Sequence, residues 1–344
     1  MVVECKMDWQ ESVRRKHAIE KIGVVRLVAL LYVRACLASN VHSDDKHRLK
    51  GKRMAMLEQT RREFLKAAGL VGIGASQLLA QSKTSENKWR SGIRVAQIRV
   101  YPEKGRLQAN HGKLMEILAE VEKTDEVDVL VTPEGFLDGY VVTEKSVAKE
   151  DLPRYAIDPE RSAYTHAASD WAKRNNAWVI YGCARKTAGG VYNTALIYNR
   201  KGALVGMYDK THIQTHDHKY LPGKHLNVYE SDFGTFGVMI CADRRWPETA
   251  RTLTLKGARV IFNPTYGMHG DLNLCMMRTR SYENGIFIVF THPGQSLITG
   301  PNGAVVCNNV DKTQTYTVTE IDLAKAPANT GGHIVDRRPD IYKL

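Results

Sequence analysis

The chain has 344 residues, 43% of them hydrophobic and 25% charged, which is enough for one large or two modest globular domains and gives no compositional sign of disorder. Its formal net charge of +12 would suit a nucleic-acid partner, but residues 1–90 hold 18 Lys and Arg against 9 Asp and Glu, whereas residues 91–344 hold 31 against 28. The main body is therefore nearly neutral, which argues against a nucleic-acid-binding surface.

A segment near the N-terminus resembles a twin-arginine export signal. Residues 60–66 read Thr-Arg-Arg-Glu-Phe-Leu-Lys, a mild apolar stretch rich in Gly and Ala follows, and small residues precede a cleavage point near Gln81. The apolar stretch is too short to span a membrane. The alternative is an ordinary amphipathic helix that happens to begin with two arginines. We predict export to the periplasm or the extracellular space, with the twin-arginine machinery as a partner.

This signal lies far from the first methionine, because 53 residues precede Met54. Those residues are of mixed charge, and their single apolar run is interrupted by two arginines and too short to span a bilayer. We therefore expect translation to start at Met54 or Met56. The predicted organisation is a non-native upstream extension at 1–53, the export signal at 54–80, a polar linker at 81–92 and the working domain at 93–344.

Strand and helix patterns alternate through the working domain. Apolar runs predict strands over 93–100, 127–132, 178–183, 193–198, 204–208, 234–240, 260–263, 286–291, 304–307 and 315–321. Apolar residues at helical spacing predict helices over 110–123, 162–175, 247–256 and 272–284. The turn at 199–202 predicts a hairpin between the strands that flank it. Together these elements predict an α/β fold with mixed sheets covered by helices.

One of the six cysteines, Cys241, stands where an apolar strand ends, a few residues before a helix that opens at Pro247. A thiol at such a strand end lies at a sheet edge, near free backbone N–H groups, so Cys241 is a candidate nucleophile. A plain structural role is the alternative. No Cys-x-x-Cys pair is present, so we predict neither a zinc site nor a thioredoxin motif. Twin-arginine substrates are generally exported folded, so disulfides are not required and we predict none. The other cysteines are interpreted as small buried hydrophobes, namely Cys5, Cys36, Cys183, Cys275 and Cys307.

Two more chemically active side chains follow strand ends. Glu134 comes after the strand at 127–132, and Lys210 comes after the strand at 204–208. In a layered α/β fold, such strand ends can converge on one crevice. There a carboxylate would take the thiol proton of Cys241, and an ammonium together with the Ala242 N–H would hold an oxyanion.

These residues resemble the three signature blocks of the nitrilase superfamily, the carbon–nitrogen hydrolases. The blocks here are Pro133-Glu134, Tyr-Asp-Lys-Thr-His at 208–212 and Gly-Val-Met-Ile-Cys-Ala-Asp at 237–243. The resemblance covers about residues 93–344. It implies a four-layer α-β-β-α sandwich that pairs through an outer helical face into a homodimer or larger homo-oligomer.

The resemblance also implies a mechanism without a metal or an organic cofactor. Glu134 would act as general base and then as general acid, and Cys241 would form a covalent thioester. Lys210 would stabilise the tetrahedral intermediate. Ammonia or an amine would leave, and water would then hydrolyse the thioester.

Within the superfamily, the string Cys-Ala-Asp-Arg-Arg-Trp-Pro-Glu-Thr at 241–249 is most similar to the N-carbamoyl-D-amino acid amidohydrolases. The matching arginines of those enzymes engage the substrate carboxylate, which a guanidinium can bind through two parallel hydrogen bonds. We therefore predict substrate contacts for Arg244 and Arg245. Structural ion pairs to Asp243 or Glu248 are the alternative.

The sequence departs from the superfamily at one position. Many members carry a second glutamate shortly before a Pro-Gly pair, where it positions the lysine and the attacking water, but this chain has Thr-His-Asp-His at 215–218. The candidates for that role are Asp217, with its shorter reach, and His216. His212 is predicted to form a wall of the active site, as in the carbamoylases, and Tyr266 to line the pocket. A metal site among the nearby histidines is the less favoured interpretation.

We predict an exported thiol hydrolase that cleaves a non-peptide C–N bond in a small amide or N-carbamoyl compound. A nitrilase, which converts a nitrile into an acid and ammonia with the same three residues, is the alternative enzyme. A catalytically inactive scaffold or binding protein of the same fold is the alternative outside catalysis. An activated Cys241 is expected to react with iodoacetamide well below the ordinary thiol pKa of about 8.5, which a scaffold would not require.

Overall fold

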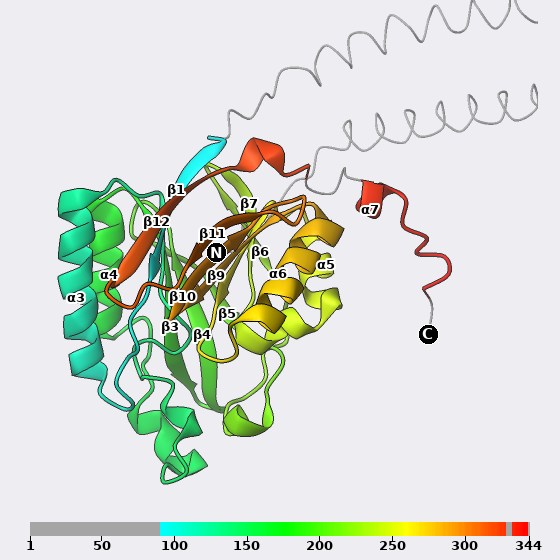
Figure 1. The fold of residues 1–344 in the computed structure, drawn as a ribbon. Helices are drawn as coiled ribbons and strands as arrows, with labels where there is room; N and C mark the ends of the chain where they lie inside the picture. Colours follow the sequence, from blue (N-terminus) through cyan, green and yellow to red (C-terminus); the bar gives the residue numbers. More distant parts are fainter. Residues whose placement is uncertain (1–89, 328–331, 343–344) are drawn as a thin grey trace, which may run out of the picture. The chain divides into compact units, whose positions relative to one another are not determined.

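The computed structural model of the protein describes residues 90–327 and 332–342, which are coloured in Figure 1. The predicted upstream extension, the export signal and most of the linker lie outside these ranges, so they stay predictions. Among the helices of the described residues, none is both long and apolar enough to cross a lipid bilayer.

The strands of the described residues form two six-stranded sheets. Sheet A has the order β12-β1-β2-β3-β4-β5, and its strands are β1 (Gly92–Ile98), β2 (Val129–Val131), β3 (Trp178–Thr187), β4 (Gly190–Tyr198), β5 (Leu204–Asp209) and β12 (Tyr316–Asp322). Sheet B has the order β11-β10-β9-β8-β7-β6, and its strands are β6 (Val228–Ser231), β7 (Gly234–Val238), β8 (Val260–Pro264), β9 (Phe287–His292), β10 (Gln295–Thr299) and β11 (Val305–Asn309). Strands β1, β2 and β3 run parallel in sheet A, as do β7, β8 and β9 in sheet B.

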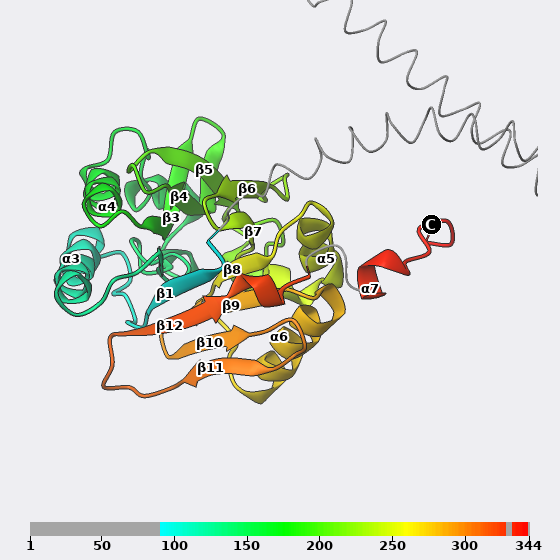
Figure 2. The ribbon, with the colours of Figure 1, turned by 90° about the horizontal axis from the view of Figure 1, so that it is seen from above.

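Helices cover the outer face of each sheet, as Figures 1 and 2 show from two directions. On sheet A these are α3 (Leu107–Thr124) and α4 (Ala163–Arg174), and on sheet B they are α5 (Pro247–Leu255) and α6 (Asp271–Asn284). The remaining helical segments are short: η1 (Val141–Thr143), η2 (Lys149–Arg154), η3 (Thr215–Asp217), η4 (Cys241–Arg245), η5 (Leu323–Lys325) and α7 (Gly332–Val335). The two sheets and their helices confirm the predicted four-layer α-β-β-α sandwich.

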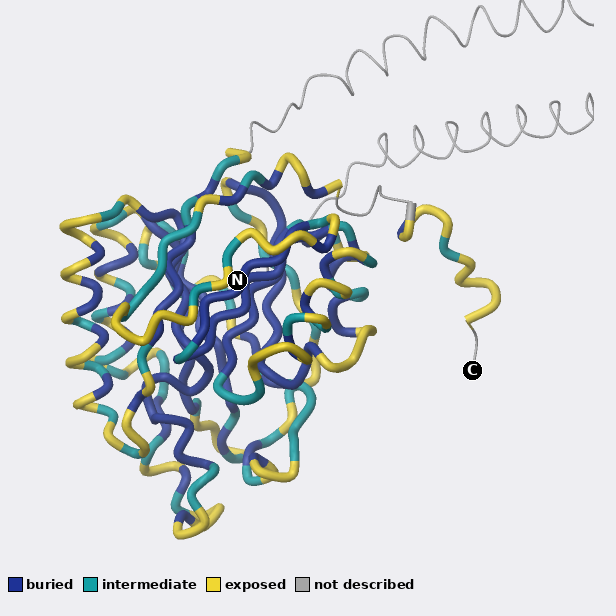
Figure 3. The backbone as a smooth tube through the Cα atoms, in the orientation of Figure 1, coloured by how far each residue is buried: buried dark blue, intermediate teal, exposed yellow. Residues whose placement is uncertain are grey.

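The alternation of apolar side chains in β1 explains how these layers stack. Ile93 and Val95 point into the core between the two sheets, whereas Ala96 and Ile98 pack beneath the outer helices of sheet A. All four side chains are completely buried because β1 is covered on both faces. Figure 3 shows that the central strands are buried and that the helices alternate between buried and exposed positions, whereas edge strands such as β11 are partly exposed.

The apolar pattern of the sequence did not predict all of the strands. The predicted hairpin across 199–202 is present as β4 and β5, but β3 continues to Thr187 and forms a second hairpin with β4. Strands β6 and β10 were not predicted either. The outer half of the β3–β4 hairpin is partly exposed and polar, so its sequence lacks the apolar pattern on which strand prediction depends.

Candidate active site

The C-terminal ends of strands from both sheets supply the chemically active side chains. Glu134 follows β2, Lys210 follows β5 directly, and Cys241 follows β7. The loop that carries Glu134 crosses β3 closely: a side chain added at Gly182 would meet the carbonyl oxygen of Pro133 at 2.3 Å. Glycine at this position therefore allows the loop to lie against the sheet.

Lys210 lies at the centre of a completely buried charged cluster. Its Nζ donates to Oε1 of Glu134 at 3.0 Å, to Oδ2 of Asp217 at 2.5 Å and to the hydroxyl of Tyr140 at 3.3 Å. The Tyr140 hydroxyl donates in turn to Oδ2 of Asp217 at 2.8 Å. Burial opposes a charge on Lys210, but the negative charges of Glu134, Cys241 and Asp217 outweigh it and raise the lysine pKa above its usual range. The ammonium therefore stays charged at every physiological pH.

Glu134 is held by hydrogen bonds from three directions. Oε1 accepts from Lys210 and from the side-chain amide of Asn193 at 2.8 Å, and Oε2 accepts from the backbone N–H of Tyr266 at 2.9 Å. Asn193 lies in sheet A and Tyr266 follows β8 of sheet B. Both sheets thus orient this carboxylate.

Cys241 occupies an unusual backbone position. Its φ of 46° lies in the left-handed region, where a side chain other than glycine costs conformational energy, and it opens the short helix η4. The thiol is buried, with 5% of the residue exposed. Burial raises the pKa of Cys241 and the Glu134 carboxylate adds to this effect, while Lys210, Arg244 and the Gly267 N–H act in the opposite direction.

The direction of this shift corrects one prediction. We expected a thiol activated in the resting protein, but the pKa of Cys241 lies above its ordinary value, so iodoacetamide should not react unusually fast at low pH. The cause is that burial disfavours the thiolate more than the nearby positive charges favour it. A buried carboxylate acting on the same thiol is then a base that can take the proton when a substrate arrives.

Asp243 connects the turn of Cys241 to the segment after Lys210. Its Oδ2 accepts from the Tyr208 hydroxyl at 2.7 Å and from the N–H of Ile240 at 3.0 Å. Its Oδ1 accepts from the Thr211 hydroxyl at 2.9 Å and from the N–H of His212 at 2.8 Å. One completely buried carboxylate therefore links the strand ends of the two sheets.

The comparison with known families agrees with this geometry. The carbon–nitrogen hydrolase family matches residues 92–328. The chain belongs to the carbon–nitrogen hydrolase family. Among its relatives are a nitrilase of Pyrococcus abyssi, 28% identical over 67% of this chain and 90% of the relative, and an N-carbamoylputrescine amidase of Arabidopsis thaliana, 31% identical over 44% of this chain and 63% of the relative.

Solved structures show the same fold. A carbon–nitrogen hydrolase from Helicobacter pylori superposes with a TM-score of 0.63 at 20% identity and covers 73% of this chain and 97% of that one. An amidase from Nesterenkonia sp. superposes with a TM-score of 0.59 at 20% identity and covers 74% of this chain and 96% of that one. This carbon–nitrogen hydrolase therefore has the architecture that its sequence predicted.

The two arginines predicted to contact substrate differ in their surroundings. Arg244 is 1% exposed, and its Nη1 lies 3.6 Å from the Cys241 sulfur. Its Nε donates to Asn273 at 2.7 Å and its Nη2 to the carbonyl of Met268 at 2.6 Å, so the guanidinium is fixed beside the thiol. Arg245 is exposed and donates to the side chain of Gln214 at 3.1 Å. Neither pairs with Asp243 or Glu248 in the structure.

The other predicted pocket residues also lie around this site. Ala242 follows Cys241 in η4 and is buried. The ring of His212 stacks on that of Trp246, with centroids 4.1 Å apart, and its Nδ1 lies 2.8 Å from Asp243. The half-exposed Tyr266 lies between the rings of Tyr140, at 5.3 Å, and Tyr101, at 6.1 Å.

The structure distinguishes the two candidates for the missing glutamate. Asp217 contacts Lys210 directly, whereas His216 is exposed and only its ring approaches Tyr140.

Tyr140 was not predicted from the sequence as a residue of the site. Nothing in its local pattern distinguishes it from a core aromatic, although its φ of 52° marks a strained turn after Gly139. The described residues contain no group of three or more His, Cys, Asp or Glu side chains placed to hold a metal ion.

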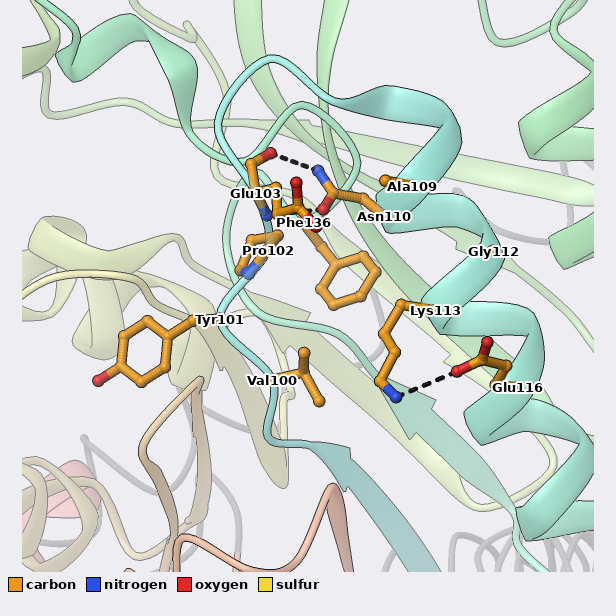
Figure 4. Close-up of a pocket in the computed structure, with 10 residues that line it drawn as sticks. All are labelled: Val100, Tyr101, Pro102, Glu103, Ala109, Asn110, Gly112, Lys113, Glu116 and Phe136. Atoms are coloured by element: carbon orange, nitrogen blue, oxygen red, sulfur yellow. Dashed lines mark hydrogen bonds and ion pairs between the residues drawn. The ribbon is translucent and has the colours of Figure 1, made fainter.

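A separate cavity of about 380 Å³ lies between α3 and the loop after β1 (Figure 4). It is lined by Val100, Tyr101, Pro102, Glu103, Ala109, Asn110, Gly112, Lys113, Glu116 and Phe136. None of the three predicted catalytic residues lines it. Two of its lining residues lie near the predicted catalytic ones: Phe136 is two positions after Glu134, and the ring of Tyr101 lies 6.1 Å from that of Tyr266.

Proposed function

We propose that this enzyme hydrolyses the C–N bond of a small amide or N-carbamoyl compound through a covalent thioester on Cys241. The observation that carries the proposal is the buried ion pair of Lys210 and Glu134, whose charges act on the Cys241 thiol. A structural core would gain little from such a pair, because desolvation offsets most of its attraction. A general base and an oxyanion holder beside a nucleophile do require it.

In the proposed reaction Glu134 accepts the thiol proton while the Cys241 sulfur attacks the carbonyl carbon. The oxyanion that forms is held by the Lys210 ammonium and the N–H of Ala242. Glu134 returns the proton to the nitrogen as the C–N bond breaks, and ammonia or an amine leaves. Water then gives a proton to Glu134 and attacks the thioester. Glu134 passes that proton to the departing sulfur, which releases the acid and restores both the Cys241 thiol and the Glu134 carboxylate.

Arg244 supports a substrate that carries a carboxylate. Its guanidinium is fixed by Asn273 and Met268 with one edge toward the thiol, and a guanidinium in a water-poor site is suited to a planar anion. Arg245 makes no comparable approach, so we assign the carboxylate contact to Arg244 alone.

The test is ammonia release by the purified protein, with wild type beside Cys241→Ala. The panel holds N-carbamoyl-D- and L-amino acids, N-carbamoyl amines, simple amides and nitriles. We expect release from amide or N-carbamoyl compounds by wild type only, with the Ala variant at least 10³-fold slower. Release from nitriles alone would favour the nitrilase alternative. No release from any compound by a folded protein would favour the inactive scaffold.

A matched pair of variants tests the substrate carboxylate. Arg244→Ala should raise the KM for carboxylate-bearing compounds by about 10- to 100-fold, the range expected when a charged hydrogen-bonding partner is lost. Uncharged amides should be affected less. Arg245→Ala, its exposed neighbour, should change either KM less than about threefold, and equal effects of the two variants would contradict the assignment.

A further inference from the structure

His292 ends strand β9 and is buried, with 1% of the residue exposed. The backbone N–H of Gly294 donates to its Nδ1 at 2.9 Å, and its Nε2 lies 2.9 Å from the carbonyl oxygen of Tyr266. A backbone N–H can only donate, so Nδ1 must be the unprotonated nitrogen. The hydrogen is therefore on Nε2, which donates to Tyr266. The structure permits only this neutral tautomer.

The peptide that His292 binds carries a second contact to the active site. The Tyr266 carbonyl and the Gly267 N–H belong to one planar peptide unit. The Gly267 N–H favours the thiolate of Cys241 and so lowers the pKa of that thiol, and a Cβ built on Gly267 would lie 3.4 Å from the Cys241 sulfur. On the preceding peptide, the N–H of Tyr266 donates to Glu134 at 2.9 Å. The Tyr266–Gly267 turn thus donates to Glu134 through the Tyr266 N–H and lies against the Cys241 sulfur at Gly267.

We propose that His292 is a positioning residue that fixes the Tyr266–Gly267 turn and thereby sets the arrangement of Glu134 relative to Cys241. The inference rests on the proposed function, in which these two residues exchange a proton. His292 contacts neither of them, so it acts through the turn. Without its hydrogen bond, the turn would lose the only side-chain donor that the described residues direct at the Tyr266 carbonyl.

The surroundings of His292 favour the neutral form of its ring, which the hydrogen bond to Tyr266 requires. Burial, together with the nearby His269 and Arg244, lowers the pKa of His292 to about 4, although the hydrogen bond to the Tyr266 carbonyl acts in the opposite direction. His269 stacks on the ring with centroids 4.4 Å apart, Tyr101 meets it edge-on at 5.9 Å, and Phe290 stacks at 6.0 Å. These neighbours include no carboxylate that would stabilise a protonated ring.

Two amide substitutions separate positioning from simple packing. The side-chain nitrogen of Gln at position 292 can lie close to where Nε2 lies, so His292→Gln retains a donor to Tyr266. Asn is shorter, and its amide reaches only as far as Nδ1, so His292→Asn loses that donor while remaining polar. His166→Gln, on the exposed side of α4, is the control for the chemical change itself.

The measurement is the alkylation rate of Cys241 by iodoacetamide at pH 8. Peptide mass mapping separates it from Cys275, which is exposed and not buried as its sequence suggested. Leaving a buried group without its hydrogen-bond partner typically costs about 10- to 100-fold. We expect His292→Asn to slow alkylation at least about tenfold, and His292→Gln and His166→Gln to stay within about threefold of wild type. Circular dichroism checks that each variant is folded.

Equal alkylation rates in wild type, His292→Gln and His292→Asn would overturn the inference. If the Asn variant does not fold, nitrogen-15 chemical shifts of the wild-type histidines still test it: a hydrogen on Nδ1 of His292 would overturn it, and a hydrogen on Nε2 would support it. Because alkylation needs no substrate, these results do not depend on the ammonia panel. Silence across that panel would count against the proposed function and not against the role of His292.

Discussion

The two sheets contribute different kinds of chemistry to one site. Sheet A delivers the charged groups: Glu134 after β2 and Lys210 after β5, with Asp217 and Tyr140 packed against the lysine. Sheet B delivers the Cys241 thiol, the proposed nucleophile, after β7 and backbone N–H donors after β8, where Tyr266 and Gly267 lie. The charged side chains of sheet A determine which groups hold the protons, whereas the backbone donors of sheet B determine the positions of Glu134 and Cys241.

This difference determines how each half tolerates change. A buried charge that loses its partner is costly, because the remaining group is neither solvated nor neutralised. A substitution cannot remove a backbone N–H donor but can displace it slightly, and its hydrogen bond then weakens with the change in distance and angle. We therefore expect substitutions on the sheet A side to affect both folding and activity, and those on the sheet B side to affect mainly activity.

The largest effect should come from Lys210→Met, which leaves Glu134 and Asp217 buried without their cation. Breaking a buried pair in this way typically costs about 3–5 kcal/mol, which lowers Tm by roughly 10 °C in a domain of this size. Ammonia release should fall at least 10³-fold. Differential scanning calorimetry measures the first effect, with Lys145→Met on the exposed surface as the control. An unchanged Tm would contradict the role of Lys210 as the charge that holds this cluster together.

A smaller effect is expected at Asp217, which contacts Lys210 and which we propose takes the place of the family's second glutamate. Asp217→Asn keeps the shape but removes one negative charge beside Lys210, so kcat should fall by about 10²-fold, in the range that general acid–base groups contribute. Asp217→Glu restores the charge and should stay within about tenfold of wild type. Steady-state kinetics with the best panel substrate decides this. His216→Ala should be close to wild type, and a larger loss there than at Asp217 would reverse the assignment.

The smallest effect concerns Asp138, a sheet A carboxyl that is completely buried and, unlike Asp217, has no lysine beside it. Burial raises the pKa of Asp138 to about 7, against hydrogen bonds from Ala184, Val141 and Tyr220 that lower it. A raised pKa in the folded state gives stability that is complete below about pH 4 and is lost as the pH rises through about 7.

Asp138→Asn cannot titrate, so its Tm should change less than that of wild type between pH 5 and pH 8. The difference should amount to several degrees, at about 2–4 °C per kcal/mol. Thermal melts at a series of pH values measure it. Parallel pH profiles for the two proteins would mean that Asp138 is not protonated in the fold.

The sequence by itself determined the layers and the reactive groups. Alternating and continuous apolar runs indicate which segments can be covered on both faces, so the positions of strands and helices predicted mixed sheets covered by helices, and the resemblance to the nitrilase superfamily implied the four-layer sandwich. The motifs around Glu134, Lys210 and Cys241 named three side chains at strand ends, and the structure brings all three into one buried site. Asp217 was one of two candidates, because a sequence does not specify the reach of a loop.

Only the tertiary structure decided the contacts that cross between the sheets. Tyr140 and His292 looked like ordinary core residues, since their partners lie 77 and 26 positions away in the chain. The prediction of an activated thiol at Cys241 was wrong because burial, which depends on packing, raises the pKa of the thiol by more than the nearby positive charges lower it. The separate surroundings of Arg244 and Arg245, adjacent in the chain, likewise arise because the turn at η4 directs one inward and leaves the other exposed. Local patterns specify elements, whereas distances between side chains depend on how the elements pack.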